Sequence, residues 1–308
     1  MKTTSVINED IARSVWAVPP IALGSENDPL TKQNVKLVKH IEAGGVETIL
    51  WGGNANIYGM TAATFAATVE AIPDWVASGT WAIPSVGPDY GKLMEHAAIL
   101  RSTAYPAAML LPYAGPRNTA GTEAAIRDFV NTSGIPAILY LRQVSYLPPE
   151  RIAALIEDGT VVALKYAVET GDLCADPYLD AILKQVPVEL IISGIGEIAA
   201  IHHHKVFALS GFTAGAVCIA PKRSVAVHKA IAMGDWNVAE LLCRPIQALE
   251  DLRIAHGAIP VLHTAITESG IVDMGRMRPH FGPLKVGIEA LVRAAVEPLL
   301  ELEKTFLE

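Results

Sequence analysis

Lys165 is the residue whose surroundings most clearly suggest covalent chemistry. It ends the apolar run 161–164 within the segment 159–168, GTVVALKYAV. A short β-branched run of this kind is typical of a buried parallel strand. Desolvation at the end of such a strand disfavours the ammonium and lowers the lysine pKa, which leaves an amine able to attack a carbonyl carbon and form a Schiff base. The alternative is a lysine whose stem packs in the core while its head reaches water.

Tyr140 lies near the end of the preceding apolar run, 135–141. If this run and 161–165 are consecutive parallel strands, they lie about 4.8 Å apart, which places Tyr140 beside Lys165. A phenol there can supply and remove the protons that imine formation and hydrolysis require. The alternative is a tyrosine that packs its ring in the core and bonds its hydroxyl to a backbone carbonyl.

The loop 51–56, WGGNAN, is the third candidate. Gly52, Gly53 and Asn54 offer backbone N–H groups and an amide side chain, and such a nest suits an anion. A 2-keto acid carries its carboxylate one bond from the carbonyl that Lys165 would attack, so we expect this loop to hold that carboxylate. The alternative is that the glycines only turn the chain after a strand.

The chain alternates regularly between short apolar runs and helix-length segments, which is typical of βαβ units. The strands and helices of these units must position the candidate residues. The expected strands are 15–23, 46–51, 80–85, 107–111, 135–141, 161–165, 188–193 and 215–219. Eight such strands predict an α/β fold, a (β/α)₈ TIM barrel, over residues 1–233. Beyond it, two long amphipathic segments, 238–256 and 284–307, with no strand between them predict a C-terminal helical extension over 234–308.

In such a barrel the working residues lie at the C-terminal ends of the strands and in the loops that follow. This rule adds Tyr113, Ser193 and Gly194 as candidate substrate-binding residues. Carboxylates and histidines are nearly absent from these ends, so we expect no metal and no cofactor. The histidine run 202–204 cannot converge on one ion, because consecutive helical side chains diverge, and we expect a solvated helix end. The GIGE fragment at 194–197 lacks the third glycine of a dinucleotide-binding motif.

Composition restricts the partners. Of the 308 residues, 51% are hydrophobic and 18% charged, with a formal net charge of -8, so a nucleic-acid or anionic membrane surface is not expected. No apolar run has the roughly 18 residues of a membrane span, and Glu9 and Asp10 interrupt the place of a signal peptide's apolar core. Cys174, Cys218 and Cys243 are far apart and suit a reducing compartment. We expect a cytoplasmic protein with a small-molecule substrate.

In their order, these residues resemble those of the dihydrodipicolinate synthase / N-acetylneuraminate lyase superfamily of class I aldolase-type barrels, over most of the chain. Tyr140 in ILYLR matches the family's tyrosine after strand five, and Lys165 in VVALKYA its imine-forming lysine on strand six. Ser193 and Gly194 in IISGIGE match its Ser-Gly after strand seven, and SGFTAGAV its glycine-rich eighth strand. The resemblance implies a Schiff base between Lys165 and pyruvate or another 2-keto acid, and a homo-oligomer, either a tetramer or a dimer.

The chain departs from the family pattern at three places. Gly53 and Asn54 occupy positions where the family has hydroxyl residues, and Ala114 stands where it often has a second tyrosine after Tyr113. Ser145 stands where a synthase of the family has an arginine. These departures argue against the condensation of pyruvate with aspartate semialdehyde that lysine biosynthesis uses.

The sequence therefore predicts an enzyme, a lyase or aldolase that acts on a 2-keto acid through an imine on Lys165. One alternative is a dehydratase of a keto-deoxy sugar acid that uses the same imine, and another is a non-catalytic barrel that binds a keto acid for regulation. The segment 276–280 could bring Arg276 or Arg278 over the barrel mouth to bind a second acidic group, or leave them as surface or interface residues. Neither the aldehyde partner nor the direction of the reaction follows from the sequence.

Overall fold

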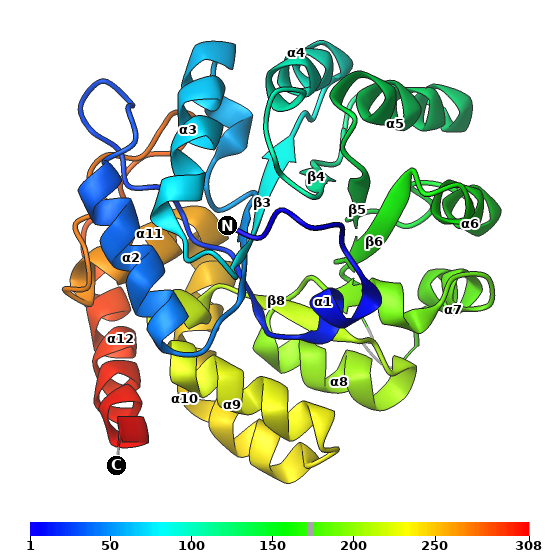
Figure 1. Ribbon diagram of the computed structural model, residues 1–308. Coiled ribbons are helices and arrows are strands. Elements are labelled where there is room, and N and C mark those ends of the chain that lie inside the picture. The colour runs from blue at the N-terminus through cyan, green and yellow to red at the C-terminus, as the bar shows by residue number, and fades with distance from the viewer. Residues whose placement is uncertain (172–174, 308) are drawn as a thin grey trace. The chain divides into compact units, whose positions relative to one another are not determined.

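The computed structural model describes residues 1–171 and 175–307, and within them eight strands follow one another in the order β1 to β8 around a closed barrel (Figure 1). The strands are β1 (Trp16–Ala17), β2 (Thr48–Trp51), β3 (Trp81–Val86), β4 (Ala108–Leu110), β5 (Ala137–Leu141), β6 (Val161–Tyr166), β7 (Ile191–Ser193) and β8 (Gly211–Ala214). The strand pairs are parallel. The predicted (β/α)₈ TIM barrel is confirmed.

Helices separate the strands and continue after the last one. They are α1 (Asn8–Ala12), α2 (Thr31–Ala43), α3 (Ala62–Trp75), α4 (Tyr90–Leu100), α5 (Thr119–Ser133), α6 (Pro149–Glu157), α7 (Pro177–Leu183), α8 (Glu197–Phe207), α9 (Pro221–Ala232), α10 (Trp236–His256), α11 (Ala258–Glu268) and α12 (Ile288–Lys304). Short 3₁₀ helices are η1 (Ile57–Gly59), η2 (Val188–Leu190), η3 (Ala216–Cys218) and η4 (Thr305–Leu307). No helix of the described ranges is long and apolar enough to span a bilayer.

Three expected strands are shorter or displaced. The first was expected over 15–23, but β1 stops at Ala17, because Pro19 and Pro20 have no N–H for a ladder. The seventh, 188–193, begins with η2 and forms a strand only from Ile191. The eighth was placed at 215–219, which is wrong: that segment contains η3, and β8 is the preceding Gly211–Ala214.

The chain divides into two compact units. One comprises Met1, Ser14–Ala82 and Ala214–Glu308, and the other Lys2–Arg13 and Ile83–Thr213. In the first, buried indoles pack edge to face in two pairs, Trp16 with Trp81 at 5.0 Å and Trp51 with Trp75 at 6.1 Å between ring centroids. Such pairs add about 0.5–1.5 kcal/mol each beyond the area they bury, so one helps to hold β1 against the start of β3 and the other holds β2 against α3.

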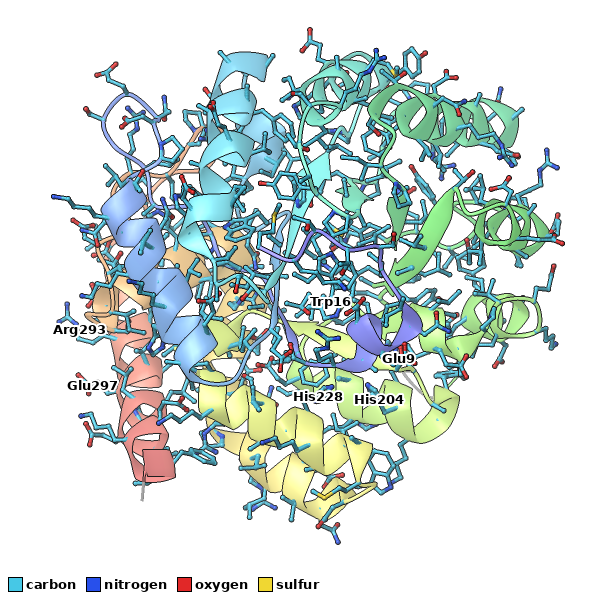
Figure 2. All side chains as sticks on the ribbon, viewed as in Figure 1. Glu9, Trp16, His204, His228, Arg293 and Glu297 are labelled. Carbon is cyan, nitrogen blue, oxygen red and sulfur yellow. The ribbon has the colours of Figure 1, made fainter. Side chains whose placement is uncertain are left out.

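The C-terminal helices belong to the first unit, where α9 and α10 lie side by side (Figure 1). The extension predicted over 234–308 contains α10, α11 and α12, of which α11 was not expected, and its status as a separate domain stays a prediction. Glu303 of α12 accepts hydrogen bonds from the backbone N–H groups of Lys222 (2.7 Å) and Arg223 (3.2 Å), and so caps the start of α9. On the same helix, Arg293 and Glu297 project outward one turn apart (Figure 2).

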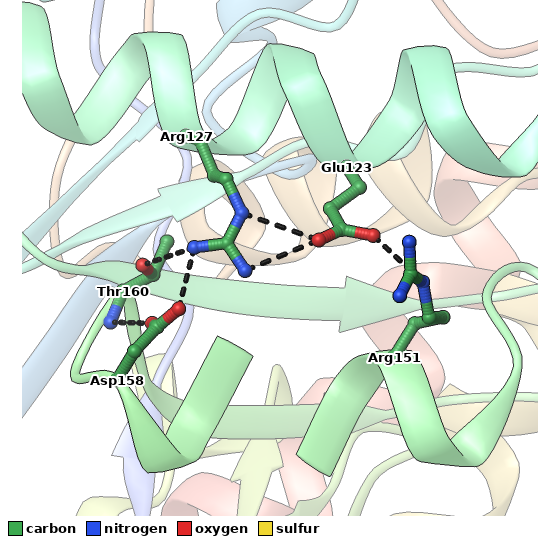
Figure 3. Close-up of polar contacts among 5 residues, drawn as sticks. All are labelled: Glu123, Arg127, Arg151, Asp158 and Thr160. Carbon is green, nitrogen blue, oxygen red and sulfur yellow. Dashed lines mark hydrogen bonds and ion pairs between the residues drawn. The ribbon is translucent and has the colours of Figure 1, made fainter. Parts of the chain in front are cut away.

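The second unit contains the lysine strand, and a charged network fixes the turn that leads into it (Figure 3). Arg127 of α5 contacts Glu123, one turn earlier on the same helix, and reaches Asp158 (2.5 Å) and Thr160 (3.4 Å) just before β6. Arg151 of α6 contacts the other oxygen of Glu123 at 2.9 Å. Partly exposed pairs of this kind contribute at most about 1 kcal/mol each, so their main effect is on the geometry of the turn.

Candidate active site

Lys165 and Tyr140 lie side by side at the ends of neighbouring strands. They are paired in the register of β5 and β6, and both are buried, with 6% and 8% of their surfaces exposed. The Lys165 Nζ lies 4.1 Å from the centroid of the Tyr140 ring. The predicted adjacency is confirmed, and the Lys165 amine lies over the face of the Tyr140 ring.

Tyr140 is a buried phenol. Burial raises the pKa of this phenol, so it carries its proton at neutral pH. Within residues 1–171 and 175–307 the hydroxyl makes no hydrogen bond, which excludes the alternative of a phenol bonded to a backbone carbonyl. A protonated phenol whose hydroxyl makes no hydrogen bond to the described residues can donate to a developing alkoxide and later take the proton back.

Gly194 packs against the lysine side chain. Its N–H donates to the Tyr166 carbonyl at 2.6 Å, which continues the pairing of β7 with β6. A Cβ at this position would lie 3.0 Å from both Cγ and Cε of Lys165, and 2.7 Å from the Cβ of Ala167. Any larger residue would therefore displace the lysine stem, and glycine is required by a close approach.

Ser193 is turned away from Lys165. It pairs with Tyr166, the residue after the lysine, and neighbouring residues of a strand point to opposite faces of the sheet. The fully buried Ser193 Oγ lies 2.9 Å from Nδ1 of His203 on α8. The structure thus brings Gly194, and not the Ser193 hydroxyl, to the stem of the lysine side chain. A role for Ser193 in substrate binding stays a prediction that its backbone alone could fulfil.

His203 corrects the expectation of a solvated histidine run. His202 is exposed and His204, labelled in Figure 2, is partly buried, but only 1% of the His203 surface is exposed. Burial lowers the pKa of His203 to about 4, so the ring is neutral at physiological pH. The signal that could have shown this is helical spacing, because His203 lies three residues after Ala200 and four before Phe207, both of which are buried.

A second buried contact lies behind the lysine strand. The Tyr166 hydroxyl donates to Oδ2 of Asp176 at 2.5 Å, and Oδ1 of the same carboxylate accepts from the N–H groups of Tyr178 and Leu179. Asp176 is thus the N-cap of α7 and ties the start of that helix to β6. Sequence reasoning missed it, although an aspartate followed by a proline is a typical helix start.

Tyr113 lies beside a separate cavity of about 660 Å³ in the second unit. Its N–H donates to the Tyr146 hydroxyl at 3.3 Å, and the Arg117 guanidinium lies 4.1 Å from the Tyr146 ring centroid. Leu139 also lines the cavity, and as the neighbour of Tyr140 in β5 it points to the opposite face of the sheet. The cavity therefore reaches the helix-facing side of β5, and a role for Tyr113 in substrate binding stays a prediction.

The glycine loop belongs to the first unit and forms a tight turn. The Gly52 and Gly53 carbonyls accept from the N–H groups of Ala55 (3.2 Å) and Asn56 (2.9 Å). The Asn54 amide donates to the Val18 carbonyl at 2.8 Å, so its nitrogen has a protein partner. These bonds account for the glycines as turn residues, and a role for Gly52, Gly53 and Asn54 in carboxylate binding stays a prediction.

The two arginines of the segment 276–280 differ in their surroundings within the first unit. Arg276 is exposed and donates to the Ser25 carbonyl. Arg278 is 4% exposed and donates to the carbonyls of Asn27 and Asn56, both at 3.3 Å. Arg278 therefore reaches the loop that follows β2, whereas Arg276 stays at the surface.

The chain is similar to known proteins over most of its length. Residues 96–298 match the dihydrodipicolinate synthetase family. The chain is 24% identical to the probable 5-dehydro-4-deoxyglucarate dehydratase 1 of Streptomyces coelicolor, over 83% of this chain and 82% of that protein. A dihydrodipicolinate synthase from Bacillus clausii superposes with a TM-score of 0.82 at 19% identity, covering 94% and 98% of the two chains. For an N-acetylneuraminate lyase from Fusobacterium nucleatum the TM-score is 0.75 at 14% identity, covering 94% and 99%. The expectation of a lyase is confirmed, and the chain belongs to the dihydrodipicolinate synthetase family.

Proposed function

We propose that this lyase acts on pyruvate or another 2-keto acid through a Schiff base on Lys165. The observation that carries the proposal is the buried Lys165 Nζ, which lies 4.1 Å above the ring of Tyr140 at the end of β6. A lysine amine attacks a ketone in its neutral form, and the adjacent phenol can supply and remove the protons that the addition requires.

In the proposed reaction the amine of Lys165 adds to the keto carbon, and the carbonyl oxygen becomes a hydroxyl with a proton from Tyr140. The phenolate takes a proton from the nitrogen and passes it to the hydroxyl, which leaves as water and gives an iminium ion beside the phenolate. In cleavage, the phenolate removes the proton of a substrate hydroxyl, and the iminium accepts the electron pair of the carbon–carbon bond that breaks. In dehydration, the phenolate removes the proton of an adjacent C–H bond and the iminium accepts the electron pair of that bond. The resulting enamine then expels the hydroxyl group one carbon further along, which takes the proton back from the phenol and leaves as water. The unbonded, protonated phenol supports this role for Tyr140.

A dehydratase of a keto-deoxy sugar acid is the second candidate. It is favoured by the Streptomyces coelicolor relative, whose name describes the dehydration of a deoxy sugar diacid. The same imine would serve, since it acidifies the adjacent C–H and so permits loss of a hydroxyl group one carbon further along. Cleavage and dehydration differ in the bond that breaks, not in the role of Lys165.

Condensation of pyruvate with aspartate semialdehyde is not part of the proposal. It would need a cation for the aldehyde's distant carboxylate, and the matching position holds Ser145, which is exposed and has a left-handed backbone (φ 58°). Arg142 is also exposed and lies 3.5 Å from Glu169. Losing a charged partner of this kind costs on the order of 2–5 kcal/mol, so we expect negligible turnover with this aldehyde.

Product analysis tests the proposal. Purified protein and its Lys165→Met variant, which preserves most of the side-chain volume, are incubated with a panel of 2-keto acids, aldol products and keto-deoxy sugar acids. We expect turnover of at least one compound by the natural protein alone, and the product distinguishes cleavage from dehydration. Equal turnover by the variant would refute the role of Lys165. Binding of a keto acid without turnover of any compound would favour a regulatory barrel over an enzyme.

We further propose a homo-oligomer, either a tetramer or a dimer, in a reducing, cytoplasmic setting. The support is the family assignment and the wide spacing of the three cysteines. Sedimentation equilibrium would test the first statement, and a monomer at micromolar concentration would contradict it.

A further inference from the structure

A buried polar pair lies directly behind the end of the lysine strand. His203 is 1% exposed, Ser193 is fully buried, and Nδ1 of one lies 2.9 Å from Oγ of the other. Buried polar groups are costly unless they are hydrogen-bonded, so each residue of the pair depends on the other. A neutral imidazole has one donor and one acceptor nitrogen, and its tautomer decides which partner donates.

Aromatic side chains hold the imidazole ring in place. Tyr166 and Phe207 contact it edge to face, with ring centroids 6.3 Å and 6.2 Å away. Tyr166 is itself fixed by its hydrogen bond to Asp176. The position of His203 is therefore set from both sides, and through its hydrogen bond it sets the position of Ser193.

The backbone at the end of β7 connects Ser193 to the residue that packs against Lys165. Gly194 follows Ser193, is bonded to the Tyr166 carbonyl at 2.6 Å, and leaves no room for a Cβ beside Cγ and Cε of Lys165. One end of β7 thus contacts His203 on the helix-facing side and Lys165 on the other. A shift of Ser193 would change the space that the lysine stem occupies over the Tyr140 ring.

We propose that His203 is a positioning residue for Lys165, and that it acts through the Ser193 hydroxyl and the backbone of Gly194. This inference rests on the proposed imine role of Lys165. It differs from a packing role, in which loss of His203 would weaken the fold and leave the reactivity of Lys165 unchanged.

Three variants separate the two roles. His203→Phe keeps an aromatic ring but removes the hydrogen bond to Ser193. His203→Asn places an amide atom near the position of Nδ1 and can restore that bond. His202→Phe is the matched control, since it makes the same change at the exposed neighbouring residue of α8.

Two rates are measured in each folded variant from pH 6 to 9. The first is formation of the adduct that borohydride traps with pyruvate, and the second is acetylation of Lys165 without substrate, followed by mass spectrometry of its peptide. Because a misplacement of about 1 Å can lower a reaction rate 10²-fold, we expect His203→Phe to slow adduct formation by about tenfold or more. It should also change how the acetylation rate of Lys165 depends on pH. His203→Asn should recover most of the adduct rate, and His202→Phe should match the natural protein. Thermal unfolding of each variant shows which remain folded.

The outcomes are distinguishable. If His203→Phe lowers the melting temperature but leaves both rates at their natural values, His203 is a packing residue and the inference is wrong. If the natural protein traps no adduct, the proposed function fails, and the acetylation rates alone decide about His203. If His203→Phe does not fold, Ser193→Ala takes its place, because it removes the same hydrogen bond from the other side. Slower adduct formation in Ser193→Ala, together with a nearly natural rate in His203→Asn, would then support the inference. Natural rates in Ser193→Ala would overturn it.

Discussion

Gly194→Ala is the substitution whose effect on Lys165 can be worked out most directly from the structure. The new Cβ would lie 2.7 Å from the Cβ of Ala167 and 3.0 Å from Cγ and Cε of Lys165. Carbon atoms in contact are normally about 3.5–4.0 Å apart, so these atoms must separate by about 0.5–1.3 Å. Ala167 belongs to the backbone-bound continuation of β6, whereas the lysine stem can rotate. We therefore expect most of the displacement at Lys165.

The expected magnitudes differ for stability and for chemistry. Overpacking by one methyl group costs about 1–3 kcal/mol of unfolding free energy. A displaced amine should lose far more in rate, on the order of 10²-fold in imine formation. Urea unfolding and rapid-quench borohydride trapping with pyruvate measure the two effects. Gly79→Ala is the control, because a Cβ at that glycine meets no atom within 4 Å. If Gly194→Ala forms the imine at the natural rate, the close approach does not position the lysine and the reasoning fails.

Three further predictions concern the phenol, the buried histidines and a helix cap. Tyr140→Phe should keep the fold and slow adduct formation about 10²-fold, and unchanged quench kinetics would leave Tyr140 a packing residue. Burial lowers the pKa of three histidines, His96, His203 and His263, from 6.5 to about 4. The unfolded chain binds protons on these residues as the pH falls from 6.5 to 4 and the folded chain does not, so unfolding free energy should be lost across that window, at most about 3 kcal/mol per histidine. Equal urea midpoints at pH 7 and pH 4.5 would contradict this. Glu303→Ala removes the cap of α9 and should lower the unfolding free energy by about 1–2 kcal/mol. Glu297→Ala, at an exposed site of the same helix, should lower it less, and equal decreases in melting temperature for the two variants would argue against the cap.

The pairing of Lys165 with Tyr140 could be predicted because it depends only on two apolar runs being consecutive parallel strands. Parallel strands of a barrel bring their C-terminal ends to one rim, so residues at matching ends become neighbours whatever lies between them in sequence. Gly194 was found by the same rule, but the reason that it must be glycine required the coordinates of the lysine stem.

The parts that sequence reasoning missed depend on side-chain direction and on small residues. His203 was expected to be solvated like His202 and His204, although its position along the helical repeat places it on the buried face of α8. Ser193 was expected at the substrate, because the register that turns it toward the helix layer cannot be read from one strand alone. The eighth strand was misplaced because glycine and alanine carry little β-propensity, and both GFTA and GAVCI consist of small or apolar residues.

Borohydride trapping shows whether Lys165 forms an imine with a 2-keto acid. The natural protein and Lys165→Met are treated with borohydride in the presence of pyruvate and of longer 2-keto acids, and the modified lysine is located by peptide mapping. We expect one stable adduct, on Lys165, which is absent from the variant. An adduct on another lysine, or none with any 2-keto acid, would contradict it.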